Sequence, residues 1–344
     1  AKTLIKKPVG KVKRLAQKNQ EDVKLKIDYQ QNQLVATRDA FGTALVKISQ
    51  KNKKVVVIDG DVKNSTRTEE FFKNFSERSY EGFIAEQVMC GLALGFSSQG
   101  FIPVTATFGA FWTRAHDFIR MAQYSQANIK FVGSHAGVSI GEDGPSQMGL
   151  EDIAMFRALA DSIILYPSDG VSGEACTQLL LKHQGIGYLR TTREKTPIIY
   201  KNEPAKRFKI GGSVTIKQSG KDKATVIAAG ITVHQALKAY SELKKNKINI
   251  RVIDAYSIRP LDKKTILKAA KETEQLIVVE DHYRGGLGDE VASLISQSNL
   301  EPKPQLKLLH VTKLPLSGKP EELLRYEEID SQAIIRAVKI KSKN

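Results

Sequence analysis

The chain has 344 residues, 41% of them hydrophobic and 26% charged, which is typical of a folded protein large enough for two domains. Its apolar runs are far shorter than the roughly 18 residues that span a bilayer. Two cysteines, Cys90 and Cys176, are too few for a disulfide framework or a four-ligand zinc site, and free thiols suit a reducing compartment. We therefore expect a soluble, cytoplasmic protein with no membrane segment and no secretion signal.

The net charge of +16 is concentrated at the two ends of the chain. Residues 1–26 contain nine Lys or Arg against two acidic residues, and residues 336–344 contain four more basic residues. A nucleic-acid-binding protein would instead carry its positive charge along one folded face, so we expect no nucleic-acid partner. Residues 1–33 are interpreted as a basic N-terminal arm that is either solvated or docked on an acidic partner.

Short β-branched runs alternate with amphipathic segments from Thr37 onward, and Thr37 is a plausible N-cap for the first helix. This alternation predicts a first α/β domain over residues 34–195. Its predicted strands are 55–58, 102–106, 129–132, 163–165 and 188–189, and its later helices are 86–97, 114–124 and 171–183.

Residues 196–212 interrupt the alternation with prolines and glycines among charged residues, and we interpret them as an interdomain linker. The alternation restarts in a second domain, 213–344, with strands 225–229, 250–253, 276–279 and 305–309 and helices 234–243, 263–271, 287–295 and 332–338. The fold class is therefore α/β, with two three-layer α/β/α domains built on parallel sheets.

Several common sites are not indicated by the sequence. The glycine cluster at 285–288 lacks the full dinucleotide-binding spacing, so a tight connection is the better interpretation. The six histidines never occur at zinc-ligand spacing with a carboxylate between them, and no nucleophile elbow is present.

Three stretches carry possible chemistry. Glu86 is a lone carboxylate among apolar neighbours, which indicates either a helix-dipole residue or a carboxyl with an altered pKa. Phe108 and Phe111 are three positions apart after a strand, a spacing that suits core packing or a flat heteroaromatic ligand equally. The loop from Gly133 to Gln147 is glycine-rich and polar after a parallel strand, where α/β enzymes place ligand groups.

Together these stretches resemble the transketolase family, with the family's motif order preserved from about Leu34 to the C-terminus. The run Gly141 to Gln147 is highly specific, and Gln147 is typical of the animal-type branch. The further matching motifs are Ala36-Thr37-Arg38, Asp59-Gly60-Asp61, Asn64-Ser65-Thr66, Ile84-Ala85-Glu86-Gln87, Tyr166-Pro167-Ser168-Asp169-Gly170, Arg190-Thr191-Thr192-Arg193 and Val279-Glu280-Asp281-His282.

The resemblance implies thiamine diphosphate as cofactor and two-carbon ketol transfer between sugar phosphates. It gives Glu86 the role of bonding the cofactor's pyrimidine ring and so activating it. It assigns Phe108, Phe111 and Gln147 to cofactor contact. Arg38, Ser65, His135 and Arg193 match the family's phosphate contacts, and Asp143 matches the group that reads a sugar hydroxyl.

The resemblance covers only the pyrimidine-binding and C-terminal domains. The family's Gly-Asp-Gly motif, which holds the diphosphate through Mg²⁺, is not found, so we expect no metal ligands in this chain. A partner N-terminal subunit is expected to supply them, with a homodimer of this chain inside a heterotetramer. A fragment of a longer chain is the other interpretation, although Ala1 followed by Lys2 fits a processed natural start.

Three alternatives stay open. The beta subunit of 2-oxo-acid dehydrogenases shares both domains, but its substrates lack phosphate. Deoxyxylulose-phosphate synthase is another relative, and a non-catalytic regulatory homologue is the third.

Overall fold

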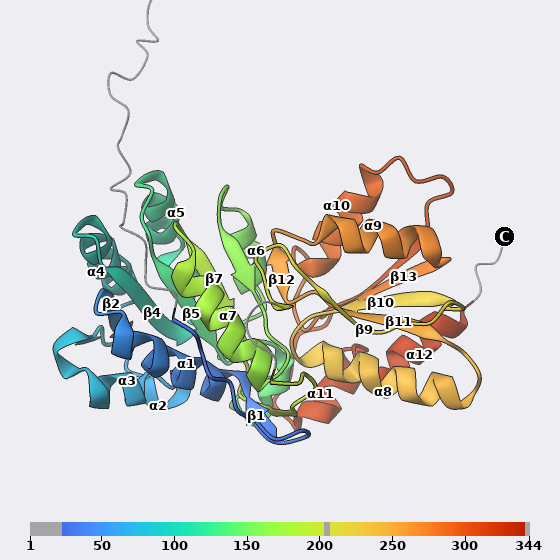
Figure 1. Cartoon of the computed structure of the whole chain (residues 1–344), viewed down its shortest axis with the longest axis horizontal. Helices are drawn as coiled ribbons and strands as arrows, with labels where there is room; N and C mark the ends of the chain where they lie inside the picture. The colour runs from blue at the N-terminus through green and yellow to red at the C-terminus, as the bar shows by residue number, and fades with distance from the viewer. Residues whose placement is uncertain (1–22, 203–206, 341–344) are drawn as a thin grey trace, which may run out of the picture.

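Two sheets organise the part of the chain that this computed structural model describes, residues 23–202 and 207–340. Most of the expected basic arm, part of the expected linker and the last four residues lie outside that part. Figure 1 shows the two α/β units side by side, the blue-to-green unit first in the chain and the yellow-to-red unit second.

The first sheet has seven strands among the described residues, and all but one of its neighbouring pairs are parallel. In spatial order the strands are β12 (Ser257–Arg259), β6 (Ile163–Leu165), β7 (Gly187–Arg190), β5 (Lys130–Ser134), β4 (Ile102–Phe108), β2 (Val55–Asp59) and β3 (Ser79–Glu81).

Helices cover both faces of this sheet because neighbouring strand residues point to opposite sides. Val57 lies in one core, under α1 (Thr37–Lys51) and α7 (Gly170–Lys182). Ile58 lies in the other core, which is closed by the helices α4 (Glu86–Ser98), α5 (His116–Tyr124) and α6 (Asp152–Arg157). The short helices α2 (Lys63–Thr66), α3 (Glu69–Asn74), η1 (Ser76–Arg78), η2 (Gly109–Ala115) and η3 (Val138–Asp143) complete this unit.

The second sheet has five described strands, in the order β14 (Gln305–Leu309), β13 (Gln275–Val279), β10 (Ala224–Ala228), β11 (Ile250–Asp254) and β9 (Val214–Lys217). Only β9 pairs antiparallel. Val226 packs under α8 (Ile231–Lys245) and α12 (Ser331–Lys339), and Ile227 lies in the core that α9 (Lys263–Glu272) and α10 (Leu287–Ser296) cover. Helix α11 (Pro320–Tyr326) lies between the two units in Figure 1.

The two units are joined by strand pairing and by a shared hydrophobic core, in addition to the chain segment that connects them. Strand β12 comes from the second unit, yet it pairs antiparallel with β6 at the edge of the first sheet. One hydrophobic core runs across both units and includes Ile164 and Tyr166 from the first and Ile227 and Ile253 from the second. Strands β1 (Leu34–Ala36) and β8 (Lys195–Pro197) form a separate antiparallel pair. The sheet of one unit is thus completed by the other.

The predicted α/β class is confirmed, and the predicted strands 163–165 and 305–309 match β6 and β14 to the residue. Three expectations need correction. The sheets are mixed, because each has an antiparallel edge strand. Thr37 is the first residue of α1 and not its N-cap; its hydroxyl oxygen accepts a hydrogen bond from the Thr192 amide at 2.9 Å. The helix expected over 114–124 begins as the 3-10 segment η2 and becomes α-helical only at His116.

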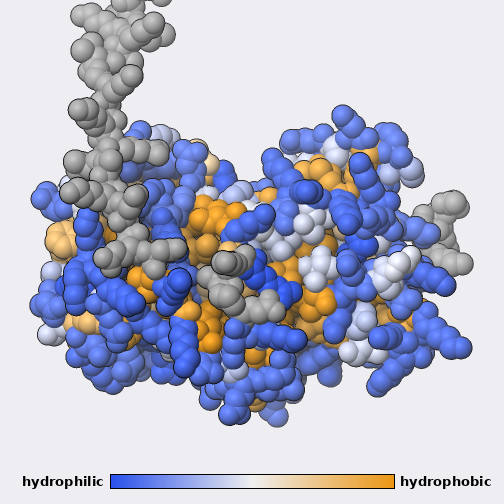
Figure 2. Space-filling model, viewed as in Figure 1, coloured by the Kyte–Doolittle hydropathy of each residue, from blue (hydrophilic) through white to orange (hydrophobic). Residues whose placement is uncertain are grey.

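Figure 2 shows hydrophilic residues around the rim of the molecule and hydrophobic ones toward the middle of this face. In the described part of the chain, no helix combines the length and apolarity needed to cross a membrane.

Candidate active site

The carboxyl edge of the first sheet collects the polar residues of this unit. Strands β2, β4 and β5 are parallel neighbours and end at Asp59, Phe108 and Ser134. Helix α4 starts at Glu86, just after the edge strand β3. Because parallel strands end at the same edge, residues far apart in sequence meet there.

The carboxylate of Glu86 is buried but not alone. Its side chain is 4% exposed, and its Oε1 accepts a hydrogen bond from Nη1 of Arg114 at 2.6 Å. The same guanidinium lies 4.5 Å from the ring centroid of Phe111. Glu86, whose sequence neighbours are apolar, therefore has a charged partner that comes from 28 residues later in the chain. Glu86 also begins α4, where a negative side chain is favoured by the helix dipole.

Three aromatic rings lie together beside this ion pair. The rings of Phe108 and Phe111 stack with centroids 5.0 Å apart and an interplanar angle of 15°. The ring of Phe108 also stacks on His135, with centroids 3.9 Å apart. The rings therefore connect the carboxylate end of the site with the residues that follow β5.

The candidate phosphate residues lie beyond His135. Arg38 Nη1 donates to the main-chain oxygen of Ser65 at 3.2 Å and lies 3.4 Å from His135 Nε2. Arg193 Nη1 lies 2.7 Å from Asp143 Oδ2, and the same oxygen is 3.7 Å from His135 Nε2. The five residues come from α1, α2, the end of β5, η3 and the segment after β7. The structure thus brings together all of the predicted substrate residues.

The electrostatics make His135 a neutral group. Burial and the neighbouring Arg38 lower the pKa of His135 to about 4, although Asp143 opposes them. The ring is therefore an uncharged hydrogen-bonding group near neutral pH, with Nδ1 3.0 Å from the hydroxyl of Ser134. His135 also has a left-handed backbone with φ 54°, a conformation that costs free energy for a residue other than glycine.

Gln147 lies further along the same loop. The side-chain Oε1 of Gln147 accepts a hydrogen bond from the hydroxyl of Ser146, and its main-chain N–H donates to the main-chain oxygen of Gly144 at 3.2 Å. No hydrogen bond or ion pair joins it to the other candidate residues in the described chain.

Asp59, the last residue of β2, holds the segment that follows this strand in place. Its Oδ2 accepts hydrogen bonds from the hydroxyls of Thr66 at 2.6 Å and Thr68 at 2.7 Å, and its Oδ1 accepts from the amide of Val62 at 2.8 Å. These bonds fix α2 and so place Ser65 against Arg38. Asp59 is therefore a structural acid that holds the segment carrying Ser65.

Two arginines were missed by reasoning from the sequence. Arg114 stands in the aromatic stretch, and its position after Phe111 is the signal that could have suggested a role. Arg67 pairs with Asp39 at 2.6 Å. Burial and then the charge of Arg67 lower the pKa of Arg38, so three basic side chains surround His135.

The glycine cluster at 285–288 is a tight connection, as predicted. The amides of Leu287 and Gly288, at the start of α10, donate to the carboxylate of Glu280 at 2.7 and 2.9 Å. The helix N-terminus is thus satisfied by the protein's own carboxylate.

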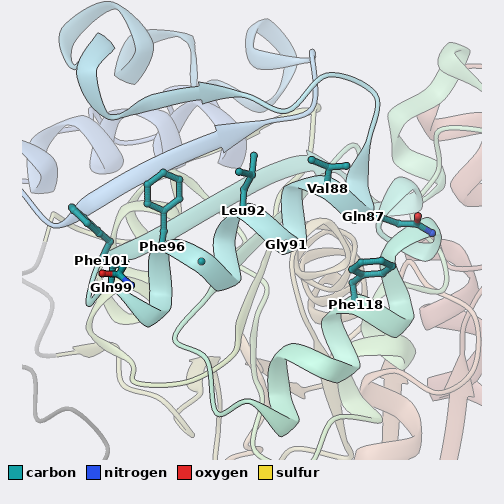
Figure 3. Close-up of a pocket in the computed structure, with 9 residues that line it drawn as sticks. Gln87, Val88, Gly91, Leu92, Phe96, Gln99, Phe101 and Phe118 are labelled. Carbon is teal, nitrogen blue, oxygen red and sulfur yellow. The ribbon is translucent and has the colours of Figure 1, made fainter.

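An apolar pocket of about 590 Å³ opens along the outer face of α4 and is lined at one end by Gln87, the residue after Glu86 (Figure 3). Leu92 and Phe96 project from α4 beside it, and Phe118 comes from α5. Nearby Ile84 and Val88 are 74% and 57% exposed. The carboxylate end of the site is therefore bordered by an exposed apolar surface.

Comparisons with known proteins agree with this geometry. The chain matches "Transketolase, pyrimidine binding domain" over residues 33–198 and "Transketolase, C-terminal domain" over residues 212–334. It is 49% identical over 337 residues to transketolase-like protein 2 of Mus musculus, covering 97% of this chain and 53% of that protein. It is 46% identical over 314 residues to transketolase of Homo sapiens, covering 90% of this chain and 50% of that protein.

A solved structure described as "Split gene transketolase, inactive beta4 tetramer" has a TM-score of 0.78 and 33% sequence identity, covering 88% of this chain and 97% of that chain. The fold and these matches define a class of protein, one with a pyrimidine-binding domain followed by a C-terminal domain. The chain belongs to the transketolase family. It spans about half the length of the curated relatives it matches.

Proposed function

We propose that this chain is the C-terminal subunit of a transketolase. It would transfer a two-carbon ketol unit from a ketose phosphate to an aldose phosphate, using thiamine diphosphate. The observation that carries the proposal is a continuous run of contacts from Glu86 through Arg114, Phe111, Phe108 and His135 to Arg38. At one end of this run, the buried carboxylate lies beside flat rings, which suits a cofactor ring. At the other end, two arginines suit a phosphorylated sugar.

The residues present fit the cofactor's pyrimidine ring. The guanidinium of Arg114 is itself a flat group that donates to Glu86 and lies over Phe111, so these two residues accept a planar hydrogen-bond donor. When bound, thiamine diphosphate supplies the nucleophilic carbon that cleaves the bond beside a ketose carbonyl. Glu86 would share a proton between its Oε1 and a pyrimidine nitrogen, and Phe111, Phe108 and Gln147 would orient the ring.

The opposite end would bind and orient the sugar phosphate. Arg38 and Arg193 supply planar forks that suit phosphate oxygens, and Ser65 lies beside Arg38. The neutral ring of His135 can donate or accept a hydrogen bond without changing the local charge. Asp143, one-third exposed beside His135, would read a sugar hydroxyl.

The partner proposal is supported by the likeness to the split-gene transketolase beta tetramer and by the surface of the chain. An N-terminal subunit would supply the diphosphate and Mg²⁺ site. A homodimer within a heterotetramer is supported by the exposed apolar face of α4. The buried free thiols of Cys90 and Cys176 suit the cytoplasm.

The deciding experiment mixes the chain with its N-terminal subunit, thiamine diphosphate and Mg²⁺. Product should form from xylulose phosphate plus ribose phosphate, and the lone chain should be inactive. Pyruvate consumption alone would instead indicate a 2-oxo-acid dehydrogenase or deoxyxylulose-phosphate synthase type.

Glu86→Ala tests the site itself and separates an enzyme from a regulatory homologue. It should lower ketol transfer about 10²- to 10⁴-fold, the usual range for a lost proton-transfer group. Asp117→Ala is the matched control, because Asp117 also lies in the first turn of a helix and pairs with an arginine at 2.9 Å, but is exposed. Equal activity in the two variants would rule out the role proposed for Glu86.

A further inference from the structure

The glycine-rich loop after β5 belongs to the first unit by sequence but packs in the core of the second. Its apolar side chains Val138, Ile140, Met148 and Leu150 are all at most 2% exposed. They join a core cluster whose other members come from the second unit, among them Leu323 of α11. The loop carries His135 at its start and Asp143 at the end of η3, so the second unit determines where these side chains lie.

One carboxylate of the second unit accepts hydrogen bonds from the loop backbone. Asp281, just after β13, is fully buried. Its Oδ1 accepts a hydrogen bond from the amide of Val138 at 2.7 Å, and its Oδ2 accepts from the amide of Ser139 at 3.3 Å. A Cβ at Gly137, where φ is +85°, would lie 2.0 Å from Oδ2. The loop backbone therefore lies directly on this carboxylate at the first turn of η3.

The base of the loop is tied to the same point. Nη2 of Arg190 donates to the main-chain oxygens of Gly149 at 2.7 Å and of Asp281 at 2.8 Å. The amide of Gly149 donates to the main-chain oxygen of His135 at 3.2 Å, which closes the loop. The start of η3 is thus held by the side chain of Asp281, and the base of the loop is connected to the main-chain oxygen of Asp281 through Arg190.

We propose that Asp281 is a positioning residue for the substrate end of the site: by holding the amides of Val138 and Ser139 it sets the place of His135 and Asp143. This inference rests on the proposed function for its link to substrate binding. It gives the C-terminal domain a defined role in the site, although that domain contributes none of the candidate contact residues.

The neighbouring residue provides a matched control. Glu280 is also a buried carboxylate after β13 and also accepts two backbone hydrogen bonds, but these come from α10 in its own unit. Glu280→Gln and Asp281→Asn therefore remove similar interactions, and only Asp281→Asn affects the loop.

The first measurement is hydrogen exchange of the purified chain. In Asp281→Asn, amides within residues 133–150 should exchange about tenfold faster or more, as expected when charged acceptors of buried amides are lost. In Glu280→Gln, faster exchange should be confined to residues 285–290. Unchanged loop exchange in Asp281→Asn would overturn the proposal. If Asp281→Asn does not fold, Gly137→Ala is measured in its place, because a Cβ at residue 137 would push the loop away from Asp281. Unchanged loop exchange in Gly137→Ala would then overturn the proposal.

The second measurement is steady-state kinetics of the reconstituted complex. Asp281→Asn should raise KM for the phosphorylated donor about tenfold while kcat falls by less, and Glu280→Gln should leave KM near the wild-type value. Equal KM changes in both variants would refute a positioning role. If the wild-type complex shows no ketol transfer, the proposed function fails, and the exchange experiment still decides whether Asp281 holds the loop.

Discussion

Replacing Arg190 by methionine should lower the free energy of unfolding more than a substitution on the surface does, and the size of the loss should depend on pH. Arg190 is fully buried, its Nε donates to Asp152 at 2.9 Å, and its guanidinium lies 4.6 Å from the ring of Tyr166. Methionine fills much of the same space but leaves the buried carboxylate of Asp152 without its cation. The hydroxyl of Tyr188, at 2.6 Å from Asp152, remains as a partner.

Breaking a buried ion pair from one side costs about 3–5 kcal/mol, because the remaining charge stays desolvated. At roughly 2 °C per kcal/mol for a protein of this size, Tm should fall by about 6–10 °C.

The pH dependence follows from the pKa of Asp152. Burial alone would raise this pKa, but Arg190, His282 and the hydroxyl of Tyr188 together outweigh burial and hold the pKa of Asp152 below its ordinary value. The wild-type pair therefore contributes stability that is present above the unfolded pKa of about 3.9 and is lost as pH falls. In Arg190→Met, only His282 and Tyr188 still oppose burial, so the folded pKa of Asp152 rises and the variant loses stability as pH increases. The difference between the two proteins should widen from about pH 4.5 to pH 7.5.

Thermal unfolding followed by circular dichroism at both pH values tests this reasoning. Arg78→Met is the control, because Arg78 is also buried and donates to main-chain oxygens of Ser49, Asn52 and Val55, but its acidic neighbour Glu77 is exposed. Adding Asp152→Asn to Arg190→Met should recover part of the loss. The reasoning is refuted if Arg190→Met is no worse than Arg78→Met, or if its penalty does not change with pH.

Two further predictions concern the surface and the site. Leu92→Asp places a charge in the apolar pocket on α4 and should weaken self-association in analytical ultracentrifugation, whereas Leu314→Asp, at a leucine 83% exposed elsewhere, should not. The ring resonances of His135 should show no titration from pH 8 down to pH 5.5, because its pKa lies near 4. The neutral ring contributes stability that is complete above the unfolded pKa of about 6.5 and declines as pH falls toward 4, so a titration near pH 6.5 would contradict the burial argument.

The central strands of both sheets were predictable because they are buried on both faces, as in the runs Val55–Ile58 and Leu276–Val279, whereas the partly exposed edge strands β3 and β9 were not predicted. Strand β12 was not, since Ser257–Arg259 has no strand pattern of its own and is defined only by pairing with β6, about 90 residues earlier in the chain. The N-cap assigned to Thr37 failed for a related reason. Its hydroxyl bonds Thr192, a tertiary partner that competes with the local cap.

The candidate site also contains residues that the sequence identified and residues that it did not. A carboxylate at Glu86 and arginines at positions 38 and 193 were identified through family motifs, and their proximity follows from strands that end at one edge. The partner of Glu86 was not identified, because Arg114 is 28 residues away and reaches it only through the turn of η2. Likewise, nothing local to Asp281 indicates that it accepts hydrogen bonds from a loop 142 residues or more earlier. Ion pairs and loop contacts between distant segments are set by tertiary packing, which sequence periodicity does not encode.

The two ends of the site therefore depend on different supports. The end around Glu86 and Phe111 borders an exposed apolar face, so its surroundings are completed only when another surface covers α4. The end around His135 and Asp143 is fixed within the chain by the second unit through Asp281. Removing a partner subunit should thus impair the cofactor end and leave the substrate end ordered, whereas Asp281→Asn should do the reverse. Hydrogen exchange of the lone chain distinguishes the two: residues 133–150 should be protected even when residues 83–92 are not.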